Sequence, residues 1–105
     1  MEIIKKFNDL VDIYFKEEHN ISFYEKKLDL KSKYLSKLSK KHNTAPPCQV
    51  LINKQIEFSK QLLKNTQKTI KEIAIEMNFE DQYYFSKLFK NKTGVSPSEF
   101  RRTKE

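Results

Sequence analysis

Apolar residues recur at helical spacing along most of the chain, and this pattern predicts about seven helices. In the first segment, residues 1–18, the apolar positions share one face of a helix. These positions are Ile3, Ile4, Phe7, Leu10, Val11, Tyr14 and Phe15. Further helices are expected at residues 21–29, 32–41, 48–64, 70–77 and 82–91, followed by a short one that begins at Ser96. The predicted fold class is therefore all-α.

The last third of the chain is the most informative part, because its polar positions mark the ends of helices. Thr69 and Glu72 form the T-x-x-E pattern of a capping box, which starts a helix by satisfying its free N–H groups. Ala74 is small, so a second helix can cross close over the first. Asn78 tolerates the left-handed conformation of a tight turn, and Asp81 is a good N-cap for the next helix. Together these signals predict a helix-turn-helix.

The second helix of this pair has distinct inward and outward faces. Phe85, Leu88 and Phe89 form its apolar side, and its other positions are mostly polar or basic. Gln82 is expected in the first turn, on the face opposite Phe85 and Phe89. A short polar and basic helix that is held outward by a supporting helix is typical of a recognition helix for DNA.

An internal repeat extends this interpretation to the first half of the chain. Four positions of the first unit recur 49 residues later: Ile21 as Ile70, Glu25 as Ala74, Leu28 as Met77, and Leu30 as Phe79. The segment YLSKL at residues 34–38 recurs as YFSKL 50 residues later. The offset grows by one across the turn, which predicts one extra residue in the second turn. Two copies are too few for a solenoid and fit two helix-turn-helix units in tandem.

Four short motifs carry a family resemblance. They are IKEIA at residues 70–74, FEDQYYFSKLFK at residues 79–90, TG at residues 93–94 and SPSEFR at residues 96–101. These motifs resemble the C-terminal signature of the AraC/XylS family of bacterial transcription regulators, and the resemblance covers about residues 5–102. It implies two helix-turn-helix units joined by a long linker helix. It also implies sequence-specific binding to double-stranded DNA, with the two recognition helices in successive major grooves.

The resemblance implies an organisation in three parts within one DNA-binding domain. Residues 1–47 hold the first helix and the first helix-turn-helix unit, residues 48–65 the linker helix, and residues 66–105 the second unit and the last helix. Family members generally add a sensor or dimerisation domain, which we do not find in this chain. We expect an excised C-terminal domain rather than a stand-alone regulator, with RNA polymerase as a second partner.

The first unit departs from the family pattern at structural positions. Glu25 replaces the small residue expected where the two helices cross, and Lys31 stands near the N-cap position, where Ser is typical. The other departures are Thr44 for Gly, Ser39 for an aromatic residue, Gln55 for Arg and, in the second unit, Asn78 for Gly. Glu25, Lys31 and Thr44 predict a looser first unit, with faster hydrogen exchange than in the second unit.

The candidate base-reading residues are the outward-facing positions of the two recognition helices. They are Ser32, Lys33, Ser36 and Lys37 in the first unit, and Gln82, Tyr83 and Lys87 in the second. The amide of Gln82 can donate and accept together, as the N6/N7 edge of adenine requires. The candidate phosphate contacts are Lys40, Lys41, Tyr84, Lys90, Lys92, Arg101 and Arg102.

Several of these residues also have a structural interpretation, which the sequence leaves open. Tyr34 and Tyr84 can act as wedges between helices, since aromatic residues at helical spacing usually belong to a core. Lys37 and Lys87 can be ordinary solvated positions, although their repetition favours a shared role. Gln82 can serve the start of its helix rather than a base.

The chain is strongly basic, which favours a polyanionic partner. Its formal net charge is +7 and its pI is about 9.4. Residues 31–41 alone carry five Lys and no acidic residue. The alternative is a helical protein-interaction module without DNA binding. Such a module needs an exposed apolar groove and does not require repeated basic helices.

Nothing in the sequence has the pattern of an enzyme or of a membrane protein. There is no Ser/His/Asp set, no Gly-rich phosphate loop and no pair of carboxylates in an apolar setting. The lone Cys48 gives neither a disulfide framework nor a zinc spacing. His19 and His42 are expected at helix ends, beside the last carbonyls. With no apolar segment of membrane length and no secretory signal, we expect a cytoplasmic protein without cofactor or metal.

Overall fold

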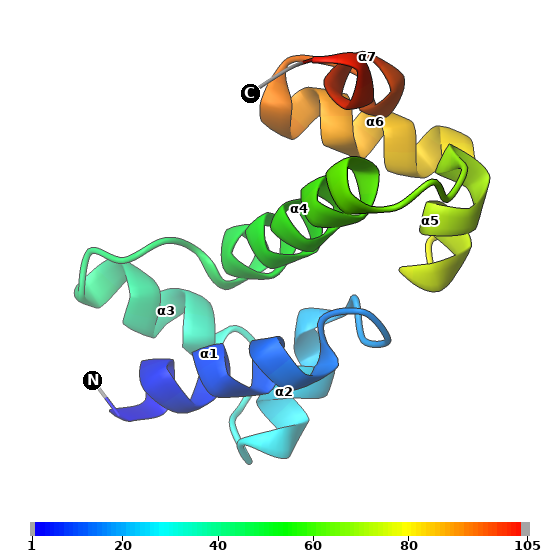
Figure 1. Cartoon of the computed structure of the whole chain (residues 1–105). Helices are drawn as coiled ribbons and strands as arrows, with labels where there is room; N and C mark the ends of the chain where they lie inside the picture. Colours follow the sequence, from blue (N-terminus) through cyan, green and yellow to red (C-terminus); the bar gives the residue numbers. More distant parts are fainter. Residues whose placement is uncertain (1, 104–105) are drawn as a thin grey trace. The chain divides into compact units, whose positions relative to one another are not determined.

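The computed structural model describes residues 2–103, and within that range the chain forms seven α-helices and no strand (Figure 1). The helices are α1 (Glu2–Tyr14), α2 (Ile21–Lys27), α3 (Tyr34–Lys41), α4 (Pro47–Asn65), α5 (Ile70–Glu76), α6 (Gln82–Thr93) and α7 (Pro97–Arg102). The all-α prediction is therefore confirmed. The predicted first residue of the first helix, Met1, lies outside the described residues.

The helices group into two compact units, and the boundary falls inside α4, between Lys54 and Gln55. The first unit contains α1, α2, α3 and the first turns of α4, and the second contains the rest of α4 with α5, α6 and α7. Helix α4 is continuous over 19 residues, which makes it about 28 Å long at a rise of about 1.5 Å per residue. The predicted three-part division at residues 47 and 65 stays a prediction.

Helix α1 supplies the centre of the first core, because its apolar stripe packs on α2 and α3. Phe7 and Val11 of α1 are buried together with Tyr24 of α2 and Leu35 of α3. The rings of Phe7 and Tyr24 meet edge to face, with their centroids 5.6 Å apart. The start of α4 joins this core through Leu51, which is also buried.

Helix α1 ends at Tyr14 and not at residue 18, so the predicted helix was too long. The chain continues in turns, in which the Glu18 N–H still reaches the Tyr14 carbonyl at 2.9 Å. Beyond these turns, the Glu18 carbonyl accepts a hydrogen bond from the Tyr24 hydroxyl at 2.8 Å. Asn20 then starts α2 as its N-cap, and its side chain accepts the Ser22 N–H at 3.0 Å.

A row of aromatic rings fills the second core. Phe85 and Phe89 of α6 have no exposed surface, and Phe79 and Phe100 extend the row on either side. Successive ring centroids are 5.3, 5.9 and 5.5 Å apart. Ala74 is buried on α5, which contacts α6, as its small size predicted.

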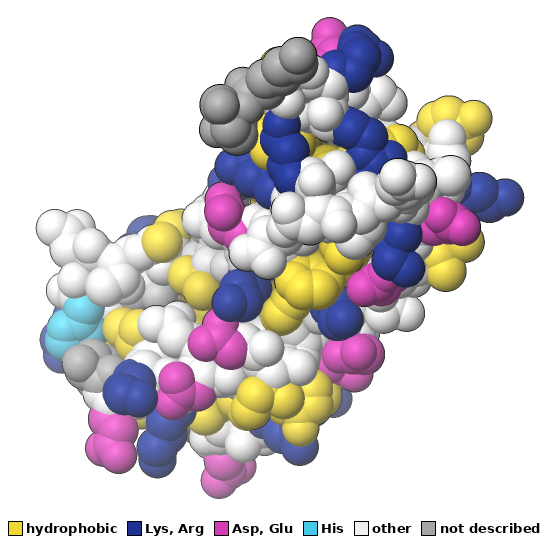
Figure 2. Space-filling model, viewed as in Figure 1, with side chains coloured by type: hydrophobic (Ala, Val, Ile, Leu, Met, Phe, Trp, Pro, Cys, Tyr) yellow, Lys and Arg dark blue, Asp and Glu magenta, His cyan; other side chains and the backbone are white. Residues whose placement is uncertain are grey.

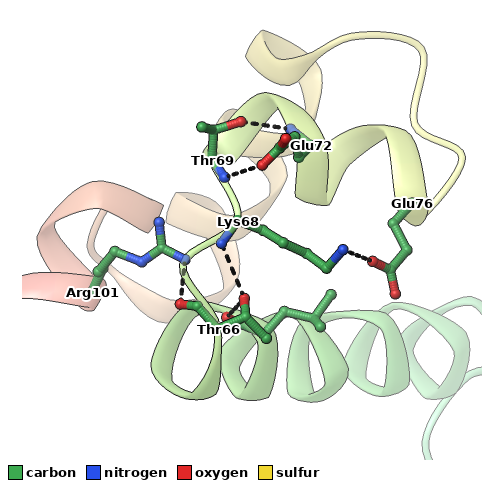
Figure 3. Close-up of polar contacts among 7 residues, drawn as sticks. Thr66, Lys68, Thr69, Glu72, Glu76 and Arg101 are labelled. Atoms are coloured by element: carbon green, nitrogen blue, oxygen red, sulfur yellow. Dashed lines mark hydrogen bonds and ion pairs between the residues drawn. The ribbon is translucent and has the colours of Figure 1, made fainter.

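The start of α5 has the capping box that the sequence predicted (Figure 3). The Thr69 N–H donates to the Glu72 carboxylate at 2.8 Å, and the Glu72 N–H donates to the Thr69 hydroxyl at 3.0 Å. Lys68, just before the box, pairs with Glu76 at the other end of the helix at 3.3 Å. Both ends of α5 are thus fixed by local contacts.

The end of α4 is closed by an arginine from α7. Arg101 donates from Nε to the Leu63 carbonyl at 2.9 Å. It also donates from a terminal nitrogen to the Thr66 carbonyl at 3.3 Å (Figure 3). The last carbonyls of a helix have no partner within the helix. Arg101 therefore caps α4 and ties α7 to it.

The last two helix boundaries also follow the predicted chemistry. Ser96 and Glu99 form a capping box at 2.9 and 3.1 Å, with Pro97 in the first helical position. Hydrogen bonds from Ser96, first from its backbone N–H and then from its side chain, hold the pKa of Glu99 below its ordinary value. Helix α6 runs two residues beyond the predicted end, to Thr93, and stops at Gly94 in the left-handed conformation, with φ of 89°.

Candidate nucleic-acid interface

The turns of the two helix pairs have the same backbone structure, which confirms the internal repeat. The Leu30 N–H donates to the Glu25 carbonyl at 2.8 Å, and the Phe79 N–H donates to the Ala74 carbonyl at 2.9 Å. One left-handed residue precedes the donor in each turn. These residues are Asp29, with φ of 58°, and Asn78, with φ of 62°.

The second turn is one residue longer than the first, as predicted. Four residues separate Asp29 from Tyr34, and five separate Asn78 from Tyr84. The extra residue therefore lies after the shared turn and before the recognition helix. In the second unit, the side chain of Asp81 accepts the Tyr84 N–H at 2.8 Å as the N-cap of α6.

Helix α6 presents a polar and aromatic surface while Phe85 and Phe89 anchor it. Tyr83 is 77% exposed, Tyr84 is 53% exposed, and Lys87 is exposed as well. The ring of Tyr84 also lies against Phe79, with centroids 5.9 Å apart. Tyr84 therefore combines the packing role with the surface hydroxyl that the sequence left as alternatives.

We expected Gln82 on the face of α6 opposite its apolar side. In the structure, Gln82 lies instead at the edge of that apolar side. It is only partly exposed, and it lines a depression of about 370 Å³ between α5 and the start of α6. The lining residues are Lys71, Ala74, Ile75, Glu80, Asp81, Gln82 and Tyr83. Ile75 is 63% exposed there. The amide of Gln82 is thus held beside α5, next to the more exposed Tyr83.

Helix α3 begins at Tyr34 and not at residue 32, so the prediction for its start was wrong. Lys31 stands three residues before Tyr34, where the second unit has Asp81 before Tyr84, and a lysine cannot accept an N–H. Lys33 is the N-cap, with φ of 68° and no hydrogen bond from its side chain. Ser32 and Lys33 are both exposed, but they lie in a turn before the helix.

The remaining base-reading candidates of the first unit lie on α3 itself. Ser36 and Lys37 are exposed there, while Leu35 and Leu38 are buried and Ser39 fills the place of Phe89 with 6% exposure. The helix has the inward and outward faces that the repeat predicted.

Glu25 was identified in the sequence only as a departure, and its contact was missed. It is 7% exposed, and its carboxylate accepts the Lys33 N–H at 2.8 Å.

A second correction concerns the end of α3. Thr44 stands where the family pattern has Gly, and it is Asn43 that takes the left-handed conformation, with φ of 58°, so the β-branched Thr44 avoids it.

Most phosphate candidates lie at the C-terminal ends of their helices. Lys40 and Lys41 end α3, Lys90 and Lys92 lie in the last turn of α6, and Arg102 ends α7; all are exposed. Cations are favourable there because the helix dipole is negative at that end. Arg101 differs, because it is partly buried in its contacts with the end of α4.

Basic side chains also gather elsewhere on the second unit. In the view of Figure 2, Lys and Arg side chains lie around hydrophobic side chains of that unit. The amino groups of Lys60 and Lys64 lie 5.9 and 5.0 Å from the centre of the Phe100 ring. These lysines add positive charge beside α7.

Other candidate chemistry is sparse in the part of the chain that the structure describes. No group of three His, Cys, Asp or Glu side chains is placed to share a metal ion among residues 2–103. None of the helices in this range combines the length and the apolar character needed to cross a bilayer. His19 Nε2 lies 3.0 Å from the Lys16 carbonyl, which belongs to the turn after α1 and is not one of the last carbonyls of the helix.

Comparison with known proteins decides the family. A family model described as a helix-turn-helix domain matches residues 24–103. The Msm operon regulatory protein of Streptococcus mutans is 38% identical over 77 residues, which make up 73% of this chain and 28% of that protein. This chain belongs to the AraC/XylS family. It is an AraC-type helix-turn-helix domain of the kind found in DNA-binding transcription regulators.

Solved structures place the fold in the same family. The C-terminal domain of the response regulator yesN from Fusobacterium nucleatum aligns with a TM-score of 0.88 and 30% identity, over 97% of this chain and 100% of that one. The DNA-binding domain of AdpA, solved with a target DNA, shares the fold at a TM-score of 0.76 and 16% identity, over 91% of this chain and 89% of that one. The AraC-type chain described here spans 28% of the length of the Msm operon regulatory protein.

Proposed function

We propose that this AraC-type domain binds specific sequences in double-stranded DNA, with α3 and α6 entering successive major grooves. The observation that carries the proposal is the repeated helix pair, in which each second helix is anchored by apolar residues and exposes a polar and basic face. The family membership supports it, and so does the shared fold with a domain solved on its target DNA. The length of α4, about 28 Å, is comparable with one turn of DNA, about 34 Å.

The two units are proposed to divide the work of reading. In the second unit, Gln82 suits an adenine edge, Tyr83 suits a thymine methyl group, and Lys87 can reach a guanine edge or the backbone. In the first unit, Ser36 and Lys37 discriminate less between bases, because a lysine is a single point charge and a hydroxyl pairs with several partners. We therefore expect the second unit to specify its half of the site more sharply.

The phosphate contacts are proposed to supply most of the affinity. The lysines at the ends of α3 and α6, together with Arg102, place positive charge beside each recognition helix. Such contacts release counterions from the duplex and carry no sequence information. They position the domain, and the exposed faces of the recognition helices choose the site.

Selection of binding sites from random duplex DNA tests this function directly. The expected result is enrichment of a site with two conserved segments about one helical turn apart, about 10–10.5 base pairs. The matched control is a competition in which the selected site and a scrambled duplex of the same composition bind the same protein. Equal affinity for both duplexes would exclude sequence-specific binding.

A helical protein-interaction module remains the second candidate, and one observation favours it. Ile75 and Tyr83 are both exposed at the depression between α5 and α6, where an apolar side chain of a partner would fit. The two functions differ in their response to duplex DNA. Binding that is salt-sensitive and that Tyr83→Ala weakens would assign this surface to DNA, whereas no binding to any duplex would favour a protein partner.

Further partners follow from the family and from the length of its members. We propose that a sensor or dimerisation domain accompanies this domain in the full-length protein, since the Msm operon regulatory protein is more than three times as long as the matched part. RNA polymerase is the proposed second partner, which places the protein in the cytoplasm. Transcription by purified RNA polymerase from a template with and without the selected site tests this contact.

A further inference from the structure

Glu25 is a buried carboxylate in a position that the second unit fills with alanine. It lies on α2 with 7% exposure, and its counterpart Ala74 lies on α5 with 1% exposure. A buried carboxylate is costly unless it accepts hydrogen bonds. Glu25 accepts the backbone N–H of Lys33 at 2.8 Å, eight residues later and across the turn to α3. The contact therefore joins the supporting helix to the start of the recognition helix.

The recognition helix α3 lacks the local cap that α6 has. In α6, Asp81 accepts the Tyr84 N–H at 2.8 Å from within its own segment. In α3, the N-cap residue Lys33 makes no such bond with its side chain, and Lys31 brings a positive charge to the place of Asp81. Glu25 brings a negative charge to this end of the helix, where the dipole favours one. The start of α3 is thus held by an acceptor on the supporting helix, which binds the N–H of the N-cap residue Lys33, whereas Asp81 binds an N–H in the first turn of α6.

The turn that Glu25 holds is conformationally unusual. Lys33 has φ of 68°, a left-handed conformation that residues other than Gly, Asn and Asp seldom adopt. Its N–H is bound by Glu25, and its carbonyl accepts the Lys37 N–H at 3.2 Å in the first turn of α3. The carboxylate is therefore connected through the backbone of Lys33 to the helix that carries Lys37.

We propose that Glu25 is a positioning residue for DNA reading, which fixes Ser32 and Lys33 and the first turn of α3 in the orientation that meets the bases. The inference rests on the proposed DNA-binding function and goes beyond it. It means that a buried carboxylate on the supporting helix α2 controls the base preference in one half of the DNA site. Glu25 does not touch DNA in this role. It acts through the conformation of Lys33.

Two substitutions separate this role from simple packing. Glu25→Ala removes the acceptor and copies the residue of the second unit, so the Lys33 N–H loses its partner. Glu25→Gln keeps the size and an oxygen that can accept the same N–H, but removes the charge. Glu17→Gln is the control for charge, because Glu17 is exposed and follows α1, outside both helix pairs. Circular dichroism and thermal unfolding of each variant report whether the fold is intact.

The local measurement is hydrogen exchange at the Lys33 amide, followed by NMR in the free 105-residue protein. Glu25→Ala is expected to raise the exchange rate of this amide by about tenfold or more, since hydrogen bonds to charged groups are among the stronger ones. Glu25→Gln is expected to raise it less, and Glu17→Gln not at all. If Glu25→Ala does not fold, Glu25→Asp serves instead, because its shorter side chain falls short of the amide.

The functional measurement is binding-site selection with the wild type and the same variants. Lys37→Ala identifies the half of the site that the first unit reads, and Gln82→Ala identifies the other half. Glu25→Ala is expected to relax the base preference in the first half by about threefold or more per position and to leave the second half unchanged. Glu25→Gln is expected to restore most of the preference.

The outcomes distinguish this inference from the proposed function. An unchanged preference in the first half, or equal relaxation in both halves, would overturn the positioning role and leave DNA binding intact. A wild-type protein that selects bases in the second half alone would also overturn it. A wild-type protein that selects no sequence at all would remove the proposed function, and the inference with it.

Discussion

At the scale of single residues, helix starts in this chain are held in two ways, by a side chain of the same turn or by one across a turn. The capping boxes at Thr69 and Ser96 depend on residues three apart, so their letters suffice. The bond from the Lys33 N–H to Glu25 depends on a left-handed lysine, which propensities disfavour. The sequence pattern therefore identified Glu25 as a departure from the family but did not predict its hydrogen bond with the Lys33 N–H.

The first prediction at this scale concerns Gln82. Gln82→Ala is expected to cost about 1–3 kcal/mol of binding free energy on the preferred site and to relax one base position, because a bidentate contact with adenine is lost. Nonspecific affinity should stay the same, since no charge changes. The measurement is binding-site selection beside Gln67→Ala, an exposed glutamine between α4 and α5. An unchanged preference at every position would leave Tyr83 and Lys87 as the readers of this half.

The second prediction concerns the titration of Tyr24. Burial, with added repulsion from Glu18 and Glu17, raises the pKa of Tyr24 to about 12 from an ordinary value of 10.0. The neutral hydroxyl is thus favoured by folding. Its contribution to the free energy of unfolding is fully present below pH 10 and is lost as the pH rises from 10 to about 12.

The difference in tyrosinate absorbance between the wild type and Tyr24→Phe isolates this group from the other tyrosines. The expected midpoint lies near pH 12 while the protein is folded. Between pH 10 and 12, the wild type should also lose more stability than Tyr24→Phe, because lysines titrate in both proteins alike. A midpoint near 10 in the folded protein would contradict the effect of burial.

At the scale of elements, the seven helices could be predicted because their apolar residues recur at one period. The errors lie at the ends, where tertiary contacts decide. Helix α1 ends at Tyr14, four residues before the predicted end, and α3 starts late because Lys31 cannot cap it. The contacts of Arg101 with the end of α4 join residues more than 30 positions apart, and no spacing rule reveals them.

The prediction at this scale separates two roles for neighbouring arginines. Arg101→Ala is expected to lower the free energy of unfolding by about 1–3 kcal/mol, because two carbonyls at the end of α4 lose a charged donor. Arg102→Ala removes the same charge from an exposed position and should change stability by less than about 0.5 kcal/mol. Urea unfolding of both variants is the measurement. If the two variants are equally stable, Arg101 does not stabilise the end of α4 and remains only a candidate phosphate contact.

At the scale of the whole molecule, two predictions from the sequence concern the relation between the two units, and the structure of each unit alone does not test them. The repeat predicts two recognition helices on the same side of the domain, and this stays a prediction, as does faster hydrogen exchange in the first unit. Glu25 gives a reason to expect less difference between the units, since its bond to the Lys33 N–H ties the start of α3 to α2.

The last prediction concerns the charge of the whole domain, which is +7. Affinity for duplex DNA should fall steeply between about 50 and 200 mM salt, because each phosphate contact releases a counterion. Lys90→Gln should weaken binding to all sequences alike and reduce the slope of log affinity against log salt by about one. Lys5→Gln makes the same change of charge on α1, where Lys5 pairs with Asp9 at 3.3 Å, and should leave the slope unchanged. A flat salt dependence would mean that the basic surplus serves solubility, and equal effects of the two substitutions would mean that Lys90 acts through net charge alone.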